Sequence, residues 1–167
     1  MSDYCQTPAS PIYTVVDMST GYRLAPIDPE AADALRIAGG TRYIADAKPG
    51  YPCRQCLQDA EIGETLVLVA YNPFTVDSPY RSRSPIFLHE RACTPHTGSV
   101  GLPNQLTSRQ LSIRAFDREA LMLDAAVIDG IYLEEQLRRF FENDAVSEIH
   151  VHNAIRGCWA TSVIRLP

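Results

Sequence analysis

Long apolar runs are missing from this sequence, since none reaches the roughly 18 residues that a membrane-spanning helix requires. Its opening stretch, MSDYCQTPASP, contains neither a basic region nor an apolar core, so we expect no secretory signal. The five cysteines are odd in number and irregularly spaced, which fits reduced thiols better than a set of disulfides. Together these features predict a cytoplasmic protein.

Lysine is nearly absent as well, because Lys48 is the only one among fifteen basic residues and the rest are arginines. Twenty acidic residues outweigh them and give a net charge of −5, which argues against non-specific binding to nucleic acid or to anionic membranes. Arginine carries a planar guanidinium that suits carboxylate and phosphate groups, so its excess fits anion recognition or buried ion pairs. A GC-rich genome would produce the same excess.

No internal repeat is present, and 167 residues suffice for one domain with a full core. We therefore expect a single domain at residues 12–167 that follows a flexible arm at residues 1–11. Alternating or β-prone runs predict strands at residues 12–17, 22–27, 41–47, 64–71, 85–90, 110–117 and 121–129.

Two helices are expected among these strands. Asp28 can cap a helix at residues 29–38, because its side chain can accept hydrogen bonds from free backbone N–H groups. A second helix is expected at residues 131–142, where the apolar side chains recur at helical spacing: Leu133, Leu137, Phe140 and Phe141. The order of elements predicts an α+β domain with a mostly antiparallel sheet.

The C-terminal stretch Val146–Arg165 gathers two histidines, a cysteine and the only tryptophan. Two strand-like runs flank a polar turn, which predicts a hairpin. With a five-residue loop, His152 would lie opposite Cys158 and His150 opposite Ala160. One face would then carry Glu148, His150, His152 and Cys158, and the other would carry Ile149, Val151, Trp159 and Val163.

Six segments in order form a pattern that resembles a known family. They are RYIADAKPGYPCR, DAEIGE, SPYRSRSPIFLH, RQLSIRAFD, VIDG and VHNAIRGC, followed by Arg165. The pattern extends over residues 27–165 and is similar to the bacterial family named domain of unknown function 1203. This resemblance implies a bacterial protein of a small stand-alone family and carries over no activity. The matching positions are Arg42, Asp46, Cys53, Arg54, Tyr80, Arg81, His89, Arg114, His152, Asn153, Cys158 and Arg165, whereas Cys56 is outside the pattern.

The sequence contains no P-loop and no G-x-G-x-x-G or G-x-S-x-G motif. Our first hypothesis is an anion pocket, because several guanidiniums on predicted strands and on the Pro-bounded loop at residues 72–84 suit a phosphate, nucleotide or carboxylate. Its ligand-binding residues would be Arg42, Arg54, Tyr80, Arg81, Arg114, Asn153 and Arg165. His89, His152 and Cys158 are the catalytic candidates, the histidines as acid/base groups and Cys158 as a thiol activated by His152.

The second hypothesis is a metal- or thiol-dependent protein that uses Cys53, His89, His152 and Cys158, whereas the first hypothesis assigns no metal ligand. C-x-x-C can chelate Zn²⁺, and H-x-H on a strand projects two imidazoles from one face, but a second close pair of ligands is missing. The candidate ligands are Cys53, Cys56, His89, Cys93, His150, His152 and Cys158. A third hypothesis is an interaction module without catalysis. The partner we expect is an anionic small molecule; the sequence indicates no cofactor and no oligomeric state.

Overall fold

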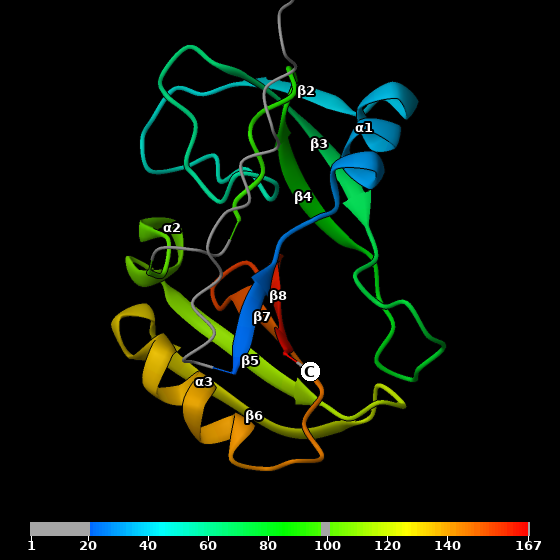
Figure 1. The fold of residues 1–167 in the computed structure, drawn as a ribbon. Helices are drawn as coiled ribbons and strands as arrows, with labels where there is room; N and C mark the ends of the chain where they lie inside the picture. The colour runs from blue at the N-terminus through cyan, green and yellow to red at the C-terminus, as the bar shows by residue number, and fades with distance from the viewer. Residues whose placement is uncertain (1–20, 98–100, 167) are drawn as a thin grey trace, which may run out of the picture.

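The computed structural model describes residues 21–97 and 101–166, and it contains two antiparallel sheets with three helices around them (Figure 1). The predicted α+β class is therefore confirmed. The strands are β1 (Tyr22–Ala25), β2 (Thr41–Ile44), β3 (Thr65–Tyr71), β4 (Ser84–His89), β5 (Gln110–Phe116), β6 (Met122–Asp129), β7 (Glu148–Asn153) and β8 (Trp159–Arg165). The arm predicted at residues 1–11 and the strand predicted at 12–17 lie outside the described residues.

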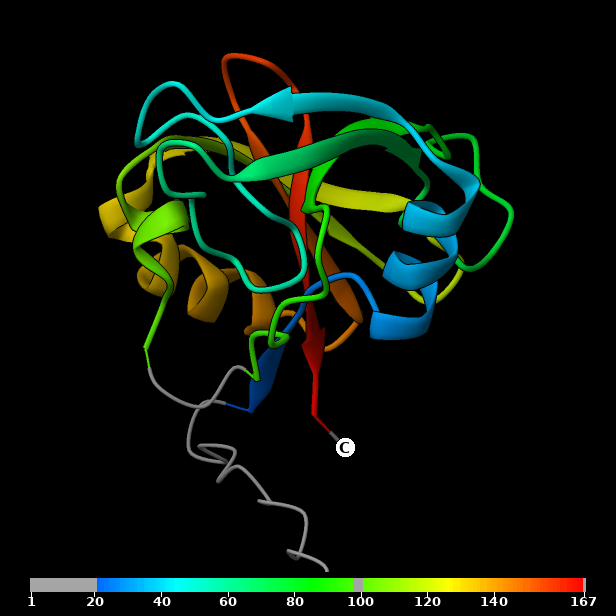
Figure 2. The same ribbon diagram turned by 90° about the horizontal axis from the view of Figure 1, so that it is seen from above.

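The larger sheet has five strands in the order β1-β8-β7-β5-β6, and helix α3 (Leu133–Phe141) covers one of its faces (Figures 1 and 2). The predicted stripe is confirmed, because Leu133 and Leu137 are fully buried against Ile113 and Ile149 of the sheet. A 3-10 turn, η2 (Gly130–Tyr132), leads into this helix. Burial of such apolar side chains is the main favourable term in the stability of this half of the fold.

The smaller sheet has the order β2-β3-β4, so the strand predicted at residues 64–71, an apolar run, lies in its centre. Leu66 is buried on one face of β3 and Val67 on the other. Helix α1 (Pro29–Ala38) packs Ala32 against the Val67 face. Its predicted cap is confirmed, because the carboxylate of Asp28 accepts hydrogen bonds from the backbone N–H groups of Glu30 and Ala31.

The tail forms the predicted hairpin, but the predicted pairing is wrong. His152 lies opposite Trp159 because the loop between them holds six residues rather than five, and His150 lies opposite Ser162 because a β-bulge between Val151 and His152 shifts the register once more. An extra residue in one strand moves every following side chain to the other face. Trp159 therefore does not join Ile149, Val151 and Val163 but faces the smaller sheet.

The second face of the larger sheet points toward the smaller sheet and the loop after β3. Trp159 packs with Val67 and Ile86 of the smaller sheet, and its backbone N–H donates to the Ser84 hydroxyl at 2.8 Å. The ring of Phe74, from the loop, lies 4.6 Å from that of His150. These contacts lie over polar residues on this face of the larger sheet. We call these residues the polar strip; they are Ser112, Arg114, His150 and His152.

Between β4 and β5, where no element is predicted from the sequence, the structure contains a further helix. Helix α2 (Asn104–Thr107) is a four-residue helix that buries Gln105 and Leu106. So short a helix shows no apolar periodicity, which is why pattern analysis did not find it. Among the described residues, no helix has both the length and the apolar character needed to cross a membrane.

Candidate metal centre

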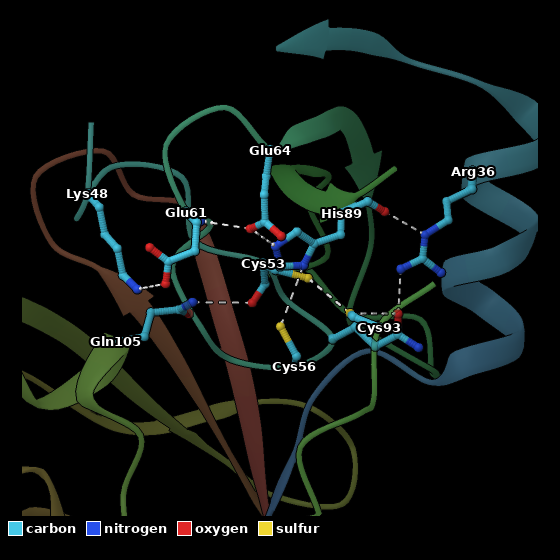
Figure 3. Close-up of polar contacts among 10 residues, drawn as sticks. Arg36, Lys48, Cys53, Cys56, Glu61, Glu64, His89, Cys93 and Gln105 are labelled. Atoms are coloured by element: carbon cyan, nitrogen blue, oxygen red, sulfur yellow. Dashed lines mark hydrogen bonds and ion pairs between the residues drawn. The ribbon is translucent and has the colours of Figure 1, made fainter. Parts of the chain in front are cut away.

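Four side chains with metal-ligating atoms meet beside the smaller sheet: Cys53, Cys56, His89 and Cys93. Their sulfur and ring nitrogen atoms all lie within 4.8 Å of one another. Figure 3 shows the three thiols and the imidazole pointing toward one another. The four residues come from three segments, which are the C-x-x-C turn, the end of β4 and the loop that follows it.

Backbone pairing brings the C-x-x-C turn to the end of β4. Cys53 forms a parallel bridge with Phe87, and the Arg54 N–H donates to the Phe87 carbonyl at 3.0 Å. His89 follows Phe87 by two residues and therefore lies next to the turn. Leu57 adopts a positive φ of 55°, a left-handed conformation that costs a non-glycine residue about 1–2 kcal/mol. The turn closes at this residue, where the Cys53 N–H donates to the Gln58 carbonyl.

Two of the separations between the four ligand atoms match those of tetrahedral zinc ligands. The Sγ atoms of Cys53 and Cys93 are 3.7 Å apart, and the Sγ of Cys56 is 3.7 Å from Nδ1 of His89. Zinc–sulfur bonds of about 2.3 Å and zinc–nitrogen bonds of about 2.0–2.1 Å place tetrahedral ligands roughly 3.8 Å apart for two sulfurs and roughly 3.6 Å apart for sulfur and nitrogen. A single zinc ion would therefore fit with little movement.

Hydrogen bonds within the cluster shift the pKa values of the thiols and the imidazole in a way that favours the binding of a cation. Hydrogen bonds from Cys56 and Cys93 lower the pKa of Cys53, whereas the hydrogen bond to Cys53 raises the pKa of Cys56. Hydrogen bonding to Cys53 and Cys93 raises the pKa of His89 to about 10. Without a metal, negative charge thus gathers on Cys53 beside a protonated imidazole. A metal ion would displace these protons.

Outer residues hold the ligands in place. Glu64 Oε2 lies 3.3 Å from Nε2 of His89, on the side of the ring opposite Cys56 (Figure 3). The Arg36 Nε donates to the His89 carbonyl at 2.8 Å, and its NH2 group donates to Oε1 of Gln55, which lies 3.5 Å from the Cys93 thiol. Nothing in the sequence points to Glu64, Arg36 or Gln55 for this site, because their roles depend on contacts between distant segments.

A cavity of about 670 Å³ opens beside the cluster, and Cys56, His89 and Cys93 form part of its wall. Its lining also includes four carboxylates, on Asp59, Glu61, Glu64 and Glu90, against one arginine, Arg91. Its lining is thus acidic rather than basic, although Arg42, Lys48 and Arg109 pair with three of these carboxylates. It provides a path by which a divalent cation can reach the thiols.

The structure brings together four of the seven candidate metal ligands and separates the other three. His150 and His152 are buried on β7, and Cys158 is half-buried before β8. Nδ1 of His152 donates to the Gly157 carbonyl at 2.9 Å, and Nε2 of His150 bonds to Glu148 at 3.0 Å. These contacts leave His89 as the one imidazole at the cluster among the described residues.

Most candidate anion ligands lie apart from one another. Arg42 is an exposed residue that pairs with Glu90, and Arg81 is an exposed residue 3.8 Å from Asp77. Arg165 donates to three backbone carbonyls at the end of α3: Phe141, Asn143 and Val146. Tyr80 packs its half-exposed ring against Phe116. Arg54, Arg114 and Asn153 lie in the polar strip between the sheets or next to it.

Comparison with known proteins gives one match. No curated protein and no solved structure matches the chain. The family model described as Protein of unknown function (DUF1203) matches residues 50–165, a segment that includes all four residues of the cluster. This finding confirms the resemblance found in the sequence. The chain belongs to the DUF1203 family.

Proposed function

We propose that the protein binds one Zn²⁺ ion through Cys53, Cys56, His89 and Cys93. The observation that carries the proposal is the set of 3.7 Å separations between ligand atoms, which are close to the edges of a tetrahedral zinc site. Three thiolates and one imidazole are a donor set that proteins use for structural zinc. Softer donors of this kind also disfavour Mg²⁺ and Ca²⁺, which prefer oxygen ligands.

The role that these ligands support is structural. Four protein ligands fill a tetrahedral zinc ion, so no position stays open for a water molecule or a substrate. Cys93 belongs to the loop after β4, whereas Cys53 belongs to the turn before β3. The ion would therefore fasten three separate segments around the small sheet, and its binding energy would add to the stability of the fold.

Thiolate ligands require reduced cysteines, which fits the cytoplasmic location expected from the sequence. All four cysteines of the described residues are free thiols. The bacterial origin implied by the resemblance is compatible with such a compartment.

The test is the metal content of the full chain, purified without a tag and without a chelator, by plasma mass spectrometry. We expect about one zinc per chain, in keeping with a single four-ligand site. Cys93→Ser should lose most of the zinc, because it removes a ligand. Cys158→Ser is the matched control, because Cys158 is also half-buried but lies outside the cluster.

Loss of zinc from Cys93→Ser could also result from unfolding of that variant. Cobalt binding to the wild-type protein therefore provides a second measurement. Co²⁺ added to the wild-type protein should give the absorption of tetrahedral thiolate coordination, and zinc should displace it. Wild-type protein with neither zinc nor cobalt uptake, or Cys93→Ser with full zinc content, would disprove the proposed site.

A further inference from the structure

The face of the larger sheet that points toward the smaller one carries polar side chains at successive positions. On β5, Arg114 lies directly opposite His150, and Ser112 lies opposite His152. Residues paired in this way share a face of the sheet. His150 and His152 are buried, whereas Arg114 is half-buried. This strip is separate from the metal cluster.

Arg54 is a buried cation that pairs with no carboxylate in the part of the chain that the structure describes. Its NH1 group donates to Oε1 of Gln105 at 3.0 Å, and its Nε has no hydrogen-bond partner within the described residues. A guanidinium stays charged at neutral pH even when it is buried. The charges of Cys158, Cys53 and Asp59 favour the charged form of Arg54, but none of these groups bonds to it, and the Asp59 carboxylate is already paired with Arg109 at 2.5 Å. The Nε of Arg54 is therefore a buried donor that no acceptor among the described residues satisfies, which is costly.

The guanidinium of Arg114 adds to the positive potential around Arg54. Arg114 and Arg54 both lower the pKa of His152, which places the imidazole within the field of both guanidiniums. Arg114 forms no ion pair or side-chain hydrogen bond with the residues at 21–97 and 101–166. On the same strip, Glu148 is already bonded to His150. The described chain therefore supplies two arginines here and leaves both without a carboxylate.

We propose that Arg54, Arg114 and His152 bind a small oxyanion, the phosphate, sulfate or carboxylate group of a small molecule, between the two sheets. A guanidinium presents parallel N–H groups that match two oxygens of such a group. The half-buried Arg114, Asn153 and Cys158 leave the strip partly open to solvent. The side chains of this site are not zinc ligands, although Arg54 lies between Cys53 and Cys56 in the same turn.

Histidine adds a feature that two arginines alone would lack. Nδ1 of His152 donates to the Gly157 carbonyl, so Nε2 is the nitrogen left for a ligand. In the neutral ring Nε2 only accepts hydrogen bonds, and it becomes a donor when the ring is protonated. An oxyanion next to the ring would favour protonation, so its binding should tighten as the pH falls toward the histidine range.

The experiment is calorimetric titration of the full chain with sodium phosphate at constant ionic strength, with sodium sulfate and sodium acetate in parallel. We expect saturable binding of at least one of them, with the preference among the three identifying the class of oxyanion. Arg114→Gln should weaken this binding about tenfold or more, because it removes charge-assisted hydrogen bonds. Arg118→Gln is the matched control, since Arg118 is an exposed arginine at the turn after β5 and should leave binding unchanged.

Arg54→Lys tests the buried partner while keeping its charge, and it should also weaken binding because lysine lacks the guanidinium fork. The zinc content of each variant is measured to establish that the metal cluster is intact. Absence of binding for all three anions, or equal binding by wild type and Arg114→Gln, overturns the proposal. Rapid alkylation of Cys158 below about pH 7 in a protein that binds none of them would instead identify its thiolate as the counter-charge of Arg54.

Discussion

The buried imidazole of His152 should make the protein less stable in mild acid. Burial lowers the pKa of His152 to about 4, the Gly157 carbonyl partly opposes this effect, and the charges of Arg114, His150 and Arg54 reinforce it. An unfolded histidine titrates near 6.5. Because the folded pKa is the lower one, the unfolded chain takes up the proton more readily. The stability from this group is complete above about pH 6.5 and is lost as the pH falls toward about 4.

The size of the effect follows from the difference between the two pKa values. A shift of roughly two and a half units corresponds to at most about 3 kcal/mol of unfolding free energy, with a slope of up to about 1.4 kcal/mol per pH unit. Urea denaturation between about pH 7 and pH 4 measures this slope. The buffer must be free of phosphate, because an anion bound near His152 would raise its pKa.

His152→Asn is the variant that isolates the histidine. An asparagine amide can still donate to the Gly157 carbonyl, but it has no proton to gain in this range. Between about pH 7 and pH 4 we expect the unfolding free energy of the wild type to fall relative to that of the variant, with a slope of up to about 1.4 kcal/mol per pH unit. Parallel profiles for the two proteins would refute the argument that His152 is held neutral by its surroundings.

Three further perturbations have definite expected outcomes. Glu64→Gln should weaken zinc binding about tenfold in a chelator competition, because a hydrogen-bonded carboxylate orients a histidine ligand, while Glu61→Gln on the same cavity wall should not. Leu137→Ala should lower the unfolding free energy by about 2–5 kcal/mol in urea, because it leaves a cavity in the core; a loss under about 1 kcal/mol would contradict its burial. Gly130→Ala should lower the melting temperature, because its new Cβ would lie 2.1 Å from a backbone carbonyl oxygen; an unchanged melting temperature would contradict that close approach.

Local patterns predicted the elements of the fold but not how they pair. Capping at Asp28 and the stripe on residues 131–142 identified both longer helices, because each signal lies within one segment. The predicted register of the tail was wrong by one residue in the loop and by one more at the bulge after Val151, and alternation alone reveals neither. The division into two sheets also escaped prediction, since strand order depends on contacts between distant residues.

The candidate site was only partly predictable, because local spacing is visible in the sequence and contacts between distant segments are not. The spacing of Cys53 and Cys56 indicated a chelating pair, and His89 and Cys93 were among the candidates. The sequence could not choose them over His150 and His152, because the choice depends on the bridge between Cys53 and Phe87. Glu64 gave no signal on its own, since it becomes a partner of His89 only after β3 and β4 have paired.

The pairing of β1 with β8 has a consequence for the order in which the chain can fold during synthesis. Tyr22 lies opposite Arg165, so the larger sheet joins the beginning of the described chain to its end. This sheet cannot close until the last strand has left the ribosome. The smaller sheet, α1 and all four cluster residues lie within residues 29–93 and are complete much earlier. We expect this earlier half, with its thiols already together, to be the first part of the nascent chain that can take up zinc.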